Sequence, residues 1–370
     1  MEKKRFYNLD LLRIVSMLMI VTLHLLSYGN VVNSIERYSI QFFILNLFQI
    51  ICLVCVNQFL LLSGYFYESK FSLQKVFRLV FEVFFYSIVI FAVLVLTGVV
   101  QFNLIDLLLS LFPILTRQYW FMTSYLACYI LSPFLKKIIN LFTRKSNKTL
   151  LIILFIFFVV YYNLFFFTEN LNFGGATGLP WFIFVYLCGA YIKKYNIHLK
   201  NALIYFILGI IICFLSRGVF WLGSILFNKE ILFTGSNIFT SVYNSLLTFP
   251  LSIVFFLLFL NIKINYKLNK IIAFFSKSAF SVYLIHDNNF LRSFLWNSLN
   301  LSNFLGTWYY FIICILVIPV AIFLVAVLVD KLRILIENVI FIFLKKPIIK
   351  LQSSINNLMD EKEECMKYEN

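Results

Sequence analysis

Runs of apolar residues long enough to cross a lipid bilayer recur from one end of this 370-residue chain to the other. A transmembrane helix needs about 20 consecutive apolar residues, and in lipid its backbone polar groups must bond within the segment. Composition agrees, because 62% of the residues are hydrophobic, 13% are charged and the mean hydropathy is +0.92. The sequence therefore predicts an all-α, polytopic membrane protein.

Ten spans are expected, at about residues 9–28, 42–66, 79–100, 118–135, 149–167, 177–192, 202–220, 238–261, 271–290 and 308–329. Residues 103–116 are apolar but too short to span, so we expect an interfacial or re-entrant segment there. We treat residues 1–330 as one transmembrane domain. Residues 331–370 are expected to form a cytoplasmic part, with an interfacial helix at 331–346 and a disordered polar tail from about residue 352.

The distribution of positive charge orients the chain. With the amino terminus in the cytoplasm, 25 of the 31 Lys and Arg residues fall inside, and five fall outside: Arg37, Arg117, Arg217, Lys229 and Arg292. The positive-inside rule then predicts that both termini are cytoplasmic. This asymmetry also accounts for the net charge of +15, so no nucleic-acid partner is needed. The basic start resembles a signal peptide, but the apolar run lacks a small-residue cleavage site and predicts a retained helix.

The first span holds two ionisable side chains, Arg13 and His24, which are expensive to place in a membrane. Eleven residues at 100° each rotate by about 1100°, which returns to within about 20° of the starting direction. The two side chains therefore share one face, about 16 Å apart along the helix. Arg13 is expected near the cytoplasmic boundary, with Asp10 one turn earlier as its partner, and His24 in the outer third.

A second of the three histidines, His286, ends the ninth span about fifteen residues in, at nearly the depth of His24. His198 lies among cytoplasmic lysines and is expected to be solvated. Less specific interpretations stay open. Either membrane histidine could simply form a hydrogen bond at the interface, and Arg13 could be a topogenic charge that extends to the headgroups.

Other polar residues have structural explanations. Arg78 and Glu82 are four residues apart, which predicts a local pair. Trp120, at the outer edge of the fourth span, is either an interfacial aromatic residue or a platform for a substrate. Helix-to-helix hydrogen bonding is the expected role of the polar residues in the second span: Asn57, Gln58, Ser63 and Tyr65. The scattered cysteines predict small buried apolar groups, and no metal site is expected.

Four segments together resemble the acyltransferase 3 family of integral membrane acyltransferases. They are FYNLDLLRIVSMLMIVTLHLLSYG at 6–29, with its Arg-x10-His spacing, FLLLSGYFY at 59–67, YWFMTSYLACYILSPFL at 119–135 and SAFSVYLIH at 278–286. They occur in the order typical of the family, and the resemblance covers residues 5 to about 330. It implies transfer of an acyl group, usually acetyl, from a cytoplasmic donor such as acetyl-CoA to a hydroxyl of a cell-surface or lipid-linked polysaccharide, in the bacterial cytoplasmic membrane.

On this resemblance, His24 would act as general base or transient acyl carrier. Arg13 would face the donor, with Arg78 as a second candidate for its phosphates. The outer wall would be formed by Arg117, Tyr283 and His286, with Trp120 stacked on a sugar and with polar support from Asp10, Ser63 and Tyr65. Acyl-CoA would be a co-substrate rather than a bound cofactor. Membrane lipids would be partners. Some members of the family carry an extracellular esterase domain after the membrane part, and none is expected here. Transfer to a distant acceptor would therefore need a separate extracytoplasmic partner, or the acceptor would have to reach the membrane itself.

Two other classes of function compete. A flippase or transporter of a lipid-linked saccharide is also polytopic and depends on charge in the membrane, but such carriers usually need related halves or broken helices. We see no similarity between the halves of this sequence. A non-catalytic membrane scaffold would leave Arg13 and His24 unexplained.

Overall fold

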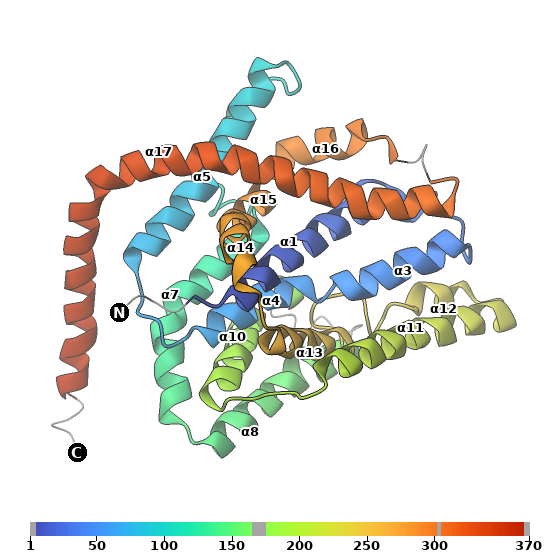
Figure 1. Cartoon of the computed structure of the whole chain (residues 1–370), viewed down its shortest axis with the longest axis horizontal. Coiled ribbons are helices and arrows are strands. Elements are labelled where there is room, and N and C mark those ends of the chain that lie inside the picture. Colours follow the sequence, from blue (N-terminus) through green and yellow to red (C-terminus); the bar gives the residue numbers. More distant parts are fainter. Residues whose placement is uncertain (1–4, 165–174, 302–304, 366–370) are drawn as a thin grey trace.

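The computed structural model describes residues 5–164, 175–301 and 305–365, and every regular element within them is a helix (Figure 1). The prediction of an all-α membrane protein is therefore confirmed. Seven helical stretches are long and apolar enough to cross a membrane: Tyr7–Tyr28, Ile40–Tyr65, Leu73–Leu96, Arg144–Leu164, Ala202–Phe227, Tyr266–His286 and Trp308–Asn356.

The other three expected spans coincide with helices that are less apolar or shorter: α7 (Trp120–Leu141), α10 (Leu179–Lys194) and α13 (Thr248–Asn261). The number ten and the cytoplasmic termini stay predictions. Residues 165–167 of the expected fifth span, and residues 366–370 of the expected tail, lie outside the described residues.

Helix α1 (Tyr7–Tyr28) lies in the middle of the bundle (Figure 1). It contacts α3 (Ile40–Cys52), α4 (Cys55–Tyr65), α13, α14 (Asn269–Ser276), α15 (Ala279–His286) and α17 (Trp308–Cys365). The expected second span is two helices, because the chain turns at residues 53–54 between α3 and α4. This central position surrounds Arg13 and His24 with other helices.

Two glycines let α4 and α10 approach closely. A Cβ atom added at Gly64 would lie 1.9 Å from the carbonyl oxygen of Tyr186, and one added at Gly189 would lie 2.2 Å from that of Leu61. Small residues at such crossings bring the two backbones into contact. The expected helix-to-helix hydrogen bonds of the second span form for Asn57 and Gln58, which donate to Oγ and to the carbonyl of Ser252 on α13, each at 3.1 Å.

The expected ninth span is broken at residues 277–278, between α14 and α15, and it ends at His286. A break in a membrane helix frees backbone groups that need new partners. Lys331 of α17 supplies one, because its Nζ donates to the carbonyl of Phe274 at 3.1 Å and to Oγ of Ser278 at 2.8 Å. Helix α17 therefore helps to fix the start of α15.

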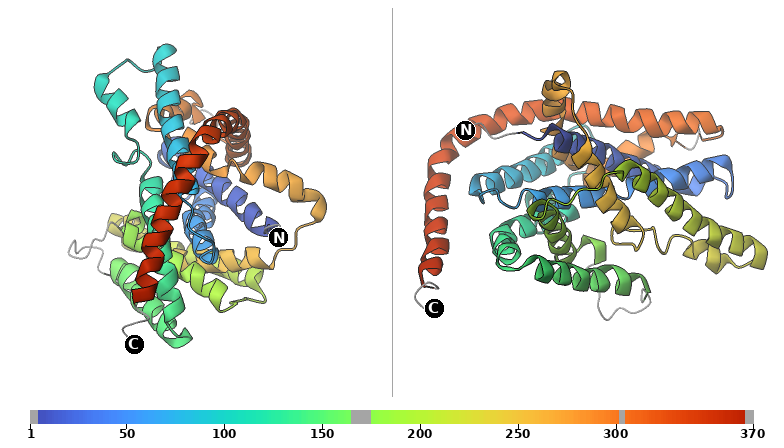
Figure 2. Two further views of the ribbon diagram at one scale, coloured as in Figure 1. Left: turned by 90° about the vertical axis from the view of Figure 1, so that its left-hand side faces the viewer. Right: turned by 60° about the horizontal axis from the view of Figure 1, so that its bottom comes forward.

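Helix α17 runs along one edge of the molecule and bends sharply toward its C-terminal end, in the part that contains Pro347 (Figures 1 and 2). A proline removes a backbone donor and bends a helix. The structure thus differs from two expectations. Residues 331–346 continue the helix that begins at Trp308 rather than forming a separate interfacial helix, and residues 352–365, expected to be disordered, are helical.

Helix α5 (Leu73–Leu96) packs against α15 and α17, and α6 (Leu104–Leu111) forms a short exposed helix within the segment expected to be interfacial. The remaining elements are α2 (Val31–Ser34), α8 (Arg144–Phe155), a π-helix (Ile156–Tyr161), α9 (Tyr162–Leu164), a 3-10 turn (Gly175–Thr177), α11 (Ala202–Phe227), α12 (Glu230–Gly235), a second 3-10 turn (Tyr266–Leu268) and α16 (Asn289–Ser298).

Candidate active site

His24 of α1 and His286 at the end of α15 are in direct contact. Nδ1 of His24 lies 3.0 Å from Nε2 of His286, and their ring centroids are 5.0 Å apart. The two residues are 262 positions apart in the sequence, yet they reach the same layer, as their positions within their spans predicted. The packing of α15 against α1 creates this pair.

The hydrogen bonds of His286 determine which nitrogen of His24 is free. Nδ1 of the buried His286 lies 2.5 Å from the carbonyl oxygen of Val282, which can only accept, so Nδ1 carries a proton. In the neutral pair, Nε2 of His286 then accepts a hydrogen bond from Nδ1 of His24. This leaves the lone pair of His24 on Nε2, which is the form that a general base or a nucleophile needs.

Asp287 adds a negative charge beside the pair. Its Oδ1 lies 3.6 Å from Nδ1 of His24, and its side chain is almost fully buried. Arg292 lies 3.3 Å from the same carboxylate oxygen, and it also lies 3.3 Å from the hydroxyl of Tyr28. A carboxylate in this position stabilises the positive charge that His24 acquires when it takes up a proton.

His24 lines a small cavity, which we call the His24 cavity, of about 30 Å³. Trp120 and Tyr283 line it too, so the structure brings together three residues that the sequence analysis selected. The Trp120 ring is stacked against Tyr243, with centroids 6.1 Å apart. The hydroxyl of Tyr283 is buried and donates to no acceptor in the described part of the chain. The other lining residues are Met17, Ile20, Leu23, Val56, Phe59, Phe121, Tyr243 and Phe280.

Toward the N-terminal end of α1, two adjoining cavities of about 360 and 330 Å³ form what we call the basic vestibule. Both are lined by Arg13, Lys75 and Tyr125. The other basic residues around them are Arg5, Lys70 and Lys277. Clustered Arg and Lys side chains of this kind bind phosphate groups.

Asp10 orients the cations of the vestibule. Its two carboxylate oxygens lie 2.5 Å from Nη1 of Arg13 and 2.5 Å from Nε of Arg5, so the pair predicted for Asp10 and Arg13 is present. Three phenylalanines, Phe59, Phe121 and Phe280, line both the vestibule and the His24 cavity. The shared face of α1 therefore carries a wide, basic space at one end and a narrow, apolar one at the other, with aromatic rings between them.

The supporting residues of the sequence analysis take different places. Ser63 lines the vestibule, and its Oγ lies 3.0 Å from the hydroxyl of Tyr125. Tyr65 packs on Phe256 instead and lines neither space. Arg117 is exposed, has a left-handed backbone with φ of 55°, and lines neither space. The structure therefore does not bring Arg117 together with His24, and its expected place in the outer wall stays a prediction.

Arg78 is also engaged elsewhere. Its Nη1 lies 2.6 Å from a carboxylate oxygen of Glu337 on α17, so it does not form the expected local pair with Glu82. It does not line the vestibule either, where Lys75, one turn earlier on α5, takes that place. The expected role of Arg78 in binding donor phosphates stays a prediction, and Lys75 is the residue of α5 that lines the vestibule.

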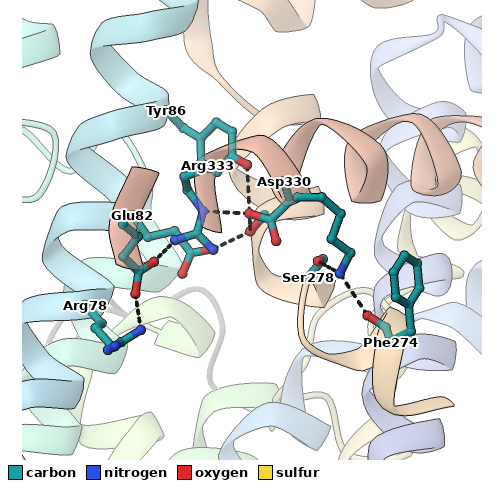
Figure 3. Close-up of polar contacts among 10 residues, drawn as sticks. Arg78, Glu82, Tyr86, Phe274, Ser278, Asp330 and Arg333 are labelled. Atoms are coloured by element: carbon teal, nitrogen blue, oxygen red, sulfur yellow. Dashed lines mark hydrogen bonds and ion pairs between the residues drawn. The ribbon is translucent and has the colours of Figure 1, made fainter. Parts of the chain in front are cut away.

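Glu82 belongs to a buried ionic cluster that joins α5, α15 and α17 (Figure 3). It accepts a hydrogen bond from Ser281 and lies 3.5 Å from Arg333, which also donates to Asp330 at 2.6 Å and to Glu337. Tyr86 donates to Asp330 at 2.9 Å, and Oγ of Ser281 lies 2.6 Å from the same oxygen, so the single hydroxyl proton of Ser281 bonds either Glu82 or Asp330. Since Ser281 and His286 are five residues apart, they differ by about 140° around α15. The cluster therefore holds α15 on the side away from His24.

Four residues of the site were not predicted from the sequence: Lys75, Asp287, Arg292 and Tyr28. Asp287 follows His286 directly, and an acidic residue beside a membrane histidine was a signal that could have found it. Arg292 lies five positions further on, and the positive-charge count placed it in a loop. Tyr28 and Lys75 have no such local signal, because only the packing of α1 against its neighbours gives them a role.

A model of a protein family described as an acyltransferase domain matches residues 6–326, which is most of the chain. The chain belongs to the acyltransferase 3 family. It is thus a membrane-bound acyltransferase with several apolar helices, and the match begins one residue before α1 and ends within α17. No curated protein and no solved structure matches the sequence significantly.

Proposed function

We propose that this acyltransferase moves an acetyl group from cytoplasmic acetyl-CoA to a hydroxyl of a cell-surface or lipid-linked polysaccharide, in the bacterial cytoplasmic membrane. The observation that carries the proposal is the position of His24. His286 orients the ring of His24, and His24 lines a small cavity. Three phenylalanine rings separate this cavity from the basic vestibule. Such an arrangement gives a thioester donor and a hydroxyl acceptor separate approaches to one imidazole.

His24 serves the reaction in one of two ways. As general base, its Nε2 takes the proton of the acceptor hydroxyl while the oxygen attacks the thioester carbonyl. The C–S bond then breaks, and the thiolate of coenzyme A takes the proton from Nε2 of His24. As acyl carrier, Nε2 attacks the carbonyl and expels the thiolate; the acceptor oxygen then takes the acetyl group, and its proton neutralises the thiolate. In both routes the buried hydroxyl of Tyr283, which donates to no acceptor in the described part of the chain, would donate to the oxyanion.

The basic vestibule suits the coenzyme part of the donor. Coenzyme A carries several phosphate charges, and Arg13, Lys75 and Lys70 supply cations in a space of about 360 Å³. Asp10 fixes the guanidinium of Arg13, so less side-chain freedom is lost when a phosphate binds. Acceptor hydroxyls would approach from the side of Trp120, whose ring offers a flat apolar face.

The size of the His24 cavity supports a short acyl group. About 30 Å³ leaves room for a few heavy atoms, as in acetyl, and the phenylalanine rings obstruct a longer chain. We predict that Phe121→Ala raises the rate with butyryl-CoA relative to acetyl-CoA at least several-fold, because the truncation opens this boundary. The measurement is the ratio of the two thioester consumption rates. Phe134→Ala is the control, since Phe134 lies on the same helix with 56% of its surface exposed.

The direct test supplies purified protein in detergent with radiolabelled acetyl-CoA and surface polysaccharide. We expect the thioester to be consumed and the label to appear on the polysaccharide. A transporter or a scaffold would do neither. Omitting the polysaccharide separates the two routes, because an acyl carrier becomes labelled itself, whereas a general base leaves the protein unlabelled. Mass spectrometry of the surface glycan from cells with and without the protein identifies the modified sugar.

A further inference from the structure

Arg217 is a buried cation without a negatively charged partner. The count of positive charges placed it outside, although it falls in the expected span 202–220; in the structure it lies within α11 and is 1% exposed. Its guanidinium donates to neutral oxygens only: Oδ1 of Asn46 at 2.6 Å, Oε1 of Gln49 at 3.1 Å, and Oγ1 and the carbonyl of Thr240 at 2.8 and 3.0 Å. No carboxylate of the described ranges lies within ion-pair distance of it. An ionisable residue inside a membrane helix marks a functional site by default.

A separate cavity of about 380 Å³ lies directly beside these partners. Asn46 and Gln49 line it, together with Trp221, Asn237 and Arg37. Residues of α2, α3, α11 and α12 line it, and α3 and α12 lie on the right-hand side of Figure 1. Amides, an indole and a guanidinium offer hydrogen bonds and an aromatic face, which suit a ligand rich in hydroxyl groups.

Gln49 connects Arg217 to the cavity, because it lines the cavity and its Oε1 accepts from Nη1 of Arg217 at 3.1 Å. Because its oxygen accepts from Arg217, its NH2 group is directed away from the guanidinium, and the guanidinium polarises its N–H bonds. Arg37 is already neutralised by two hydrogen bonds of 2.8 Å to Glu230. The net positive charge beside the cavity is therefore that of Arg217, and a negatively charged group of a ligand would balance it.

The segment between α12 and α13, residues 236–247, joins this cavity to the active site. Thr240 of this segment binds Arg217, and three residues later Tyr243 lines the His24 cavity and stacks on Trp120. Asn57 of α4 holds the carbonyl of Tyr243 at 2.8 Å. A ligand in the cavity would thus be linked to the surroundings of His24 through residues 236–247.

We propose that this cavity binds an acidic saccharide, with Gln49 and the charge of Arg217 facing its carboxylate or phosphate. The inference rests on the proposed function in one respect: the bound saccharide is taken to be the acceptor, so the acceptor would be a negatively charged glycan.

Titration calorimetry on the full chain in detergent tests the proposal with two pairs of probes. These are tetragalacturonate with its fully methyl-esterified form, and mannose 6-phosphate with mannose. We expect the charged member of at least one pair to bind at least tenfold more tightly, which corresponds to about 1.4 kcal/mol, and to lose affinity as salt is added. Equal affinities within both pairs would overturn the proposal.

Gln49→Glu is the sharpest variant, because it places a carboxylate next to Arg217 and balances the charge internally. We expect this variant to bind the charged probe about tenfold or more weakly than the wild type does, while its melting temperature does not fall. Lys229→Gln is the matched control, since it removes an exposed cation at the same end that does not line the cavity. Unchanged affinity in Gln49→Glu, or an equal loss in Lys229→Gln, would contradict the proposal.

An anionic lipid headgroup shares this chemistry, so the titrations are repeated in phosphatidylcholine nanodiscs with and without phosphatidylglycerol. Saccharide affinity that is independent of phosphatidylglycerol supports the proposal, whereas its complete loss would assign the cavity to lipid. Consumption of acetyl-CoA in the presence of surface polysaccharide is measured on the same preparation. A protein that binds the charged probe but never consumes acetyl-CoA would contradict the proposed function and leave the saccharide site intact.

Discussion

Replacement of His24 by glutamine is expected to reduce acetyl transfer by at least about 100-fold, because a positioned general base contributes roughly 10² to 10⁴ in rate and a carrier contributes more. Glutamine keeps most of the side-chain volume, so the protein should still accumulate in the membrane. The measurement is consumption of labelled acetyl-CoA by equal amounts of purified protein. His198→Gln serves as the control, because His198 is exposed and lies outside the site.

The partner histidine gives this prediction a second part. His286 contacts His24 rather than the reactants, so it acts as a positioning residue. His286→Gln retains an oxygen that accepts from Nδ1 of His24, whereas His286→Leu does not. We therefore expect the leucine variant to lose much more activity than the glutamine variant, and its rate to depend differently on pH. Wild-type activity in His24→Gln would remove His24 from the mechanism, and equal losses in both His286 variants would argue for a structural role alone.

The sequence predicted those parts of the site that depend on helical periodicity within one span. The shared face of Arg13 and His24, the pairing of Asp10 with Arg13, and the matching depth of His286 follow from residue spacing and apolar runs. The resemblance to known acyltransferases then selected Trp120 and Tyr283, and both line the same cavity as His24.

What the sequence could not predict depends on contacts between distant helices. Arg78 pairs with Glu337, which lies 259 positions away, and only the path of α17 past α5 brings them together. The same contacts make residues 331–346 part of a continuous helix, since Arg333 and Glu337 are buried there. The burial of Arg217 was not predicted, because a count of charges cannot show that Asn46, Gln49 and Thr240 surround it.

The buried ionic cluster leads to the largest expected effect on stability. Arg333 is 3% exposed and contacts three carboxylates, those of Glu82, Asp330 and Glu337. Arg333→Met would leave these buried groups without the cation that they share, and breaking a buried ion pair in this way costs about 3 to 5 kcal/mol. Thermal unfolding of the purified protein in detergent measures the change. Arg37→Met is the matched control, because the ion pair that Arg37 forms with Glu230 is exposed and should contribute little.

The composition of the cluster also predicts that a second substitution can restore part of the stability that Arg333→Met loses. If excess negative charge causes the destabilisation, then Glu82→Gln, which removes one carboxylate but keeps its shape, should restore part of the melting temperature that Arg333→Met loses. A loss caused only by poorer packing would be additive in the double variant. The double-variant cycle therefore separates the two causes. Because Ser281 ties α15 to Glu82 and Asp330, destabilisation of the cluster is expected to disturb the His24–His286 contact as well, and to lower acyl transfer in the variants that still fold.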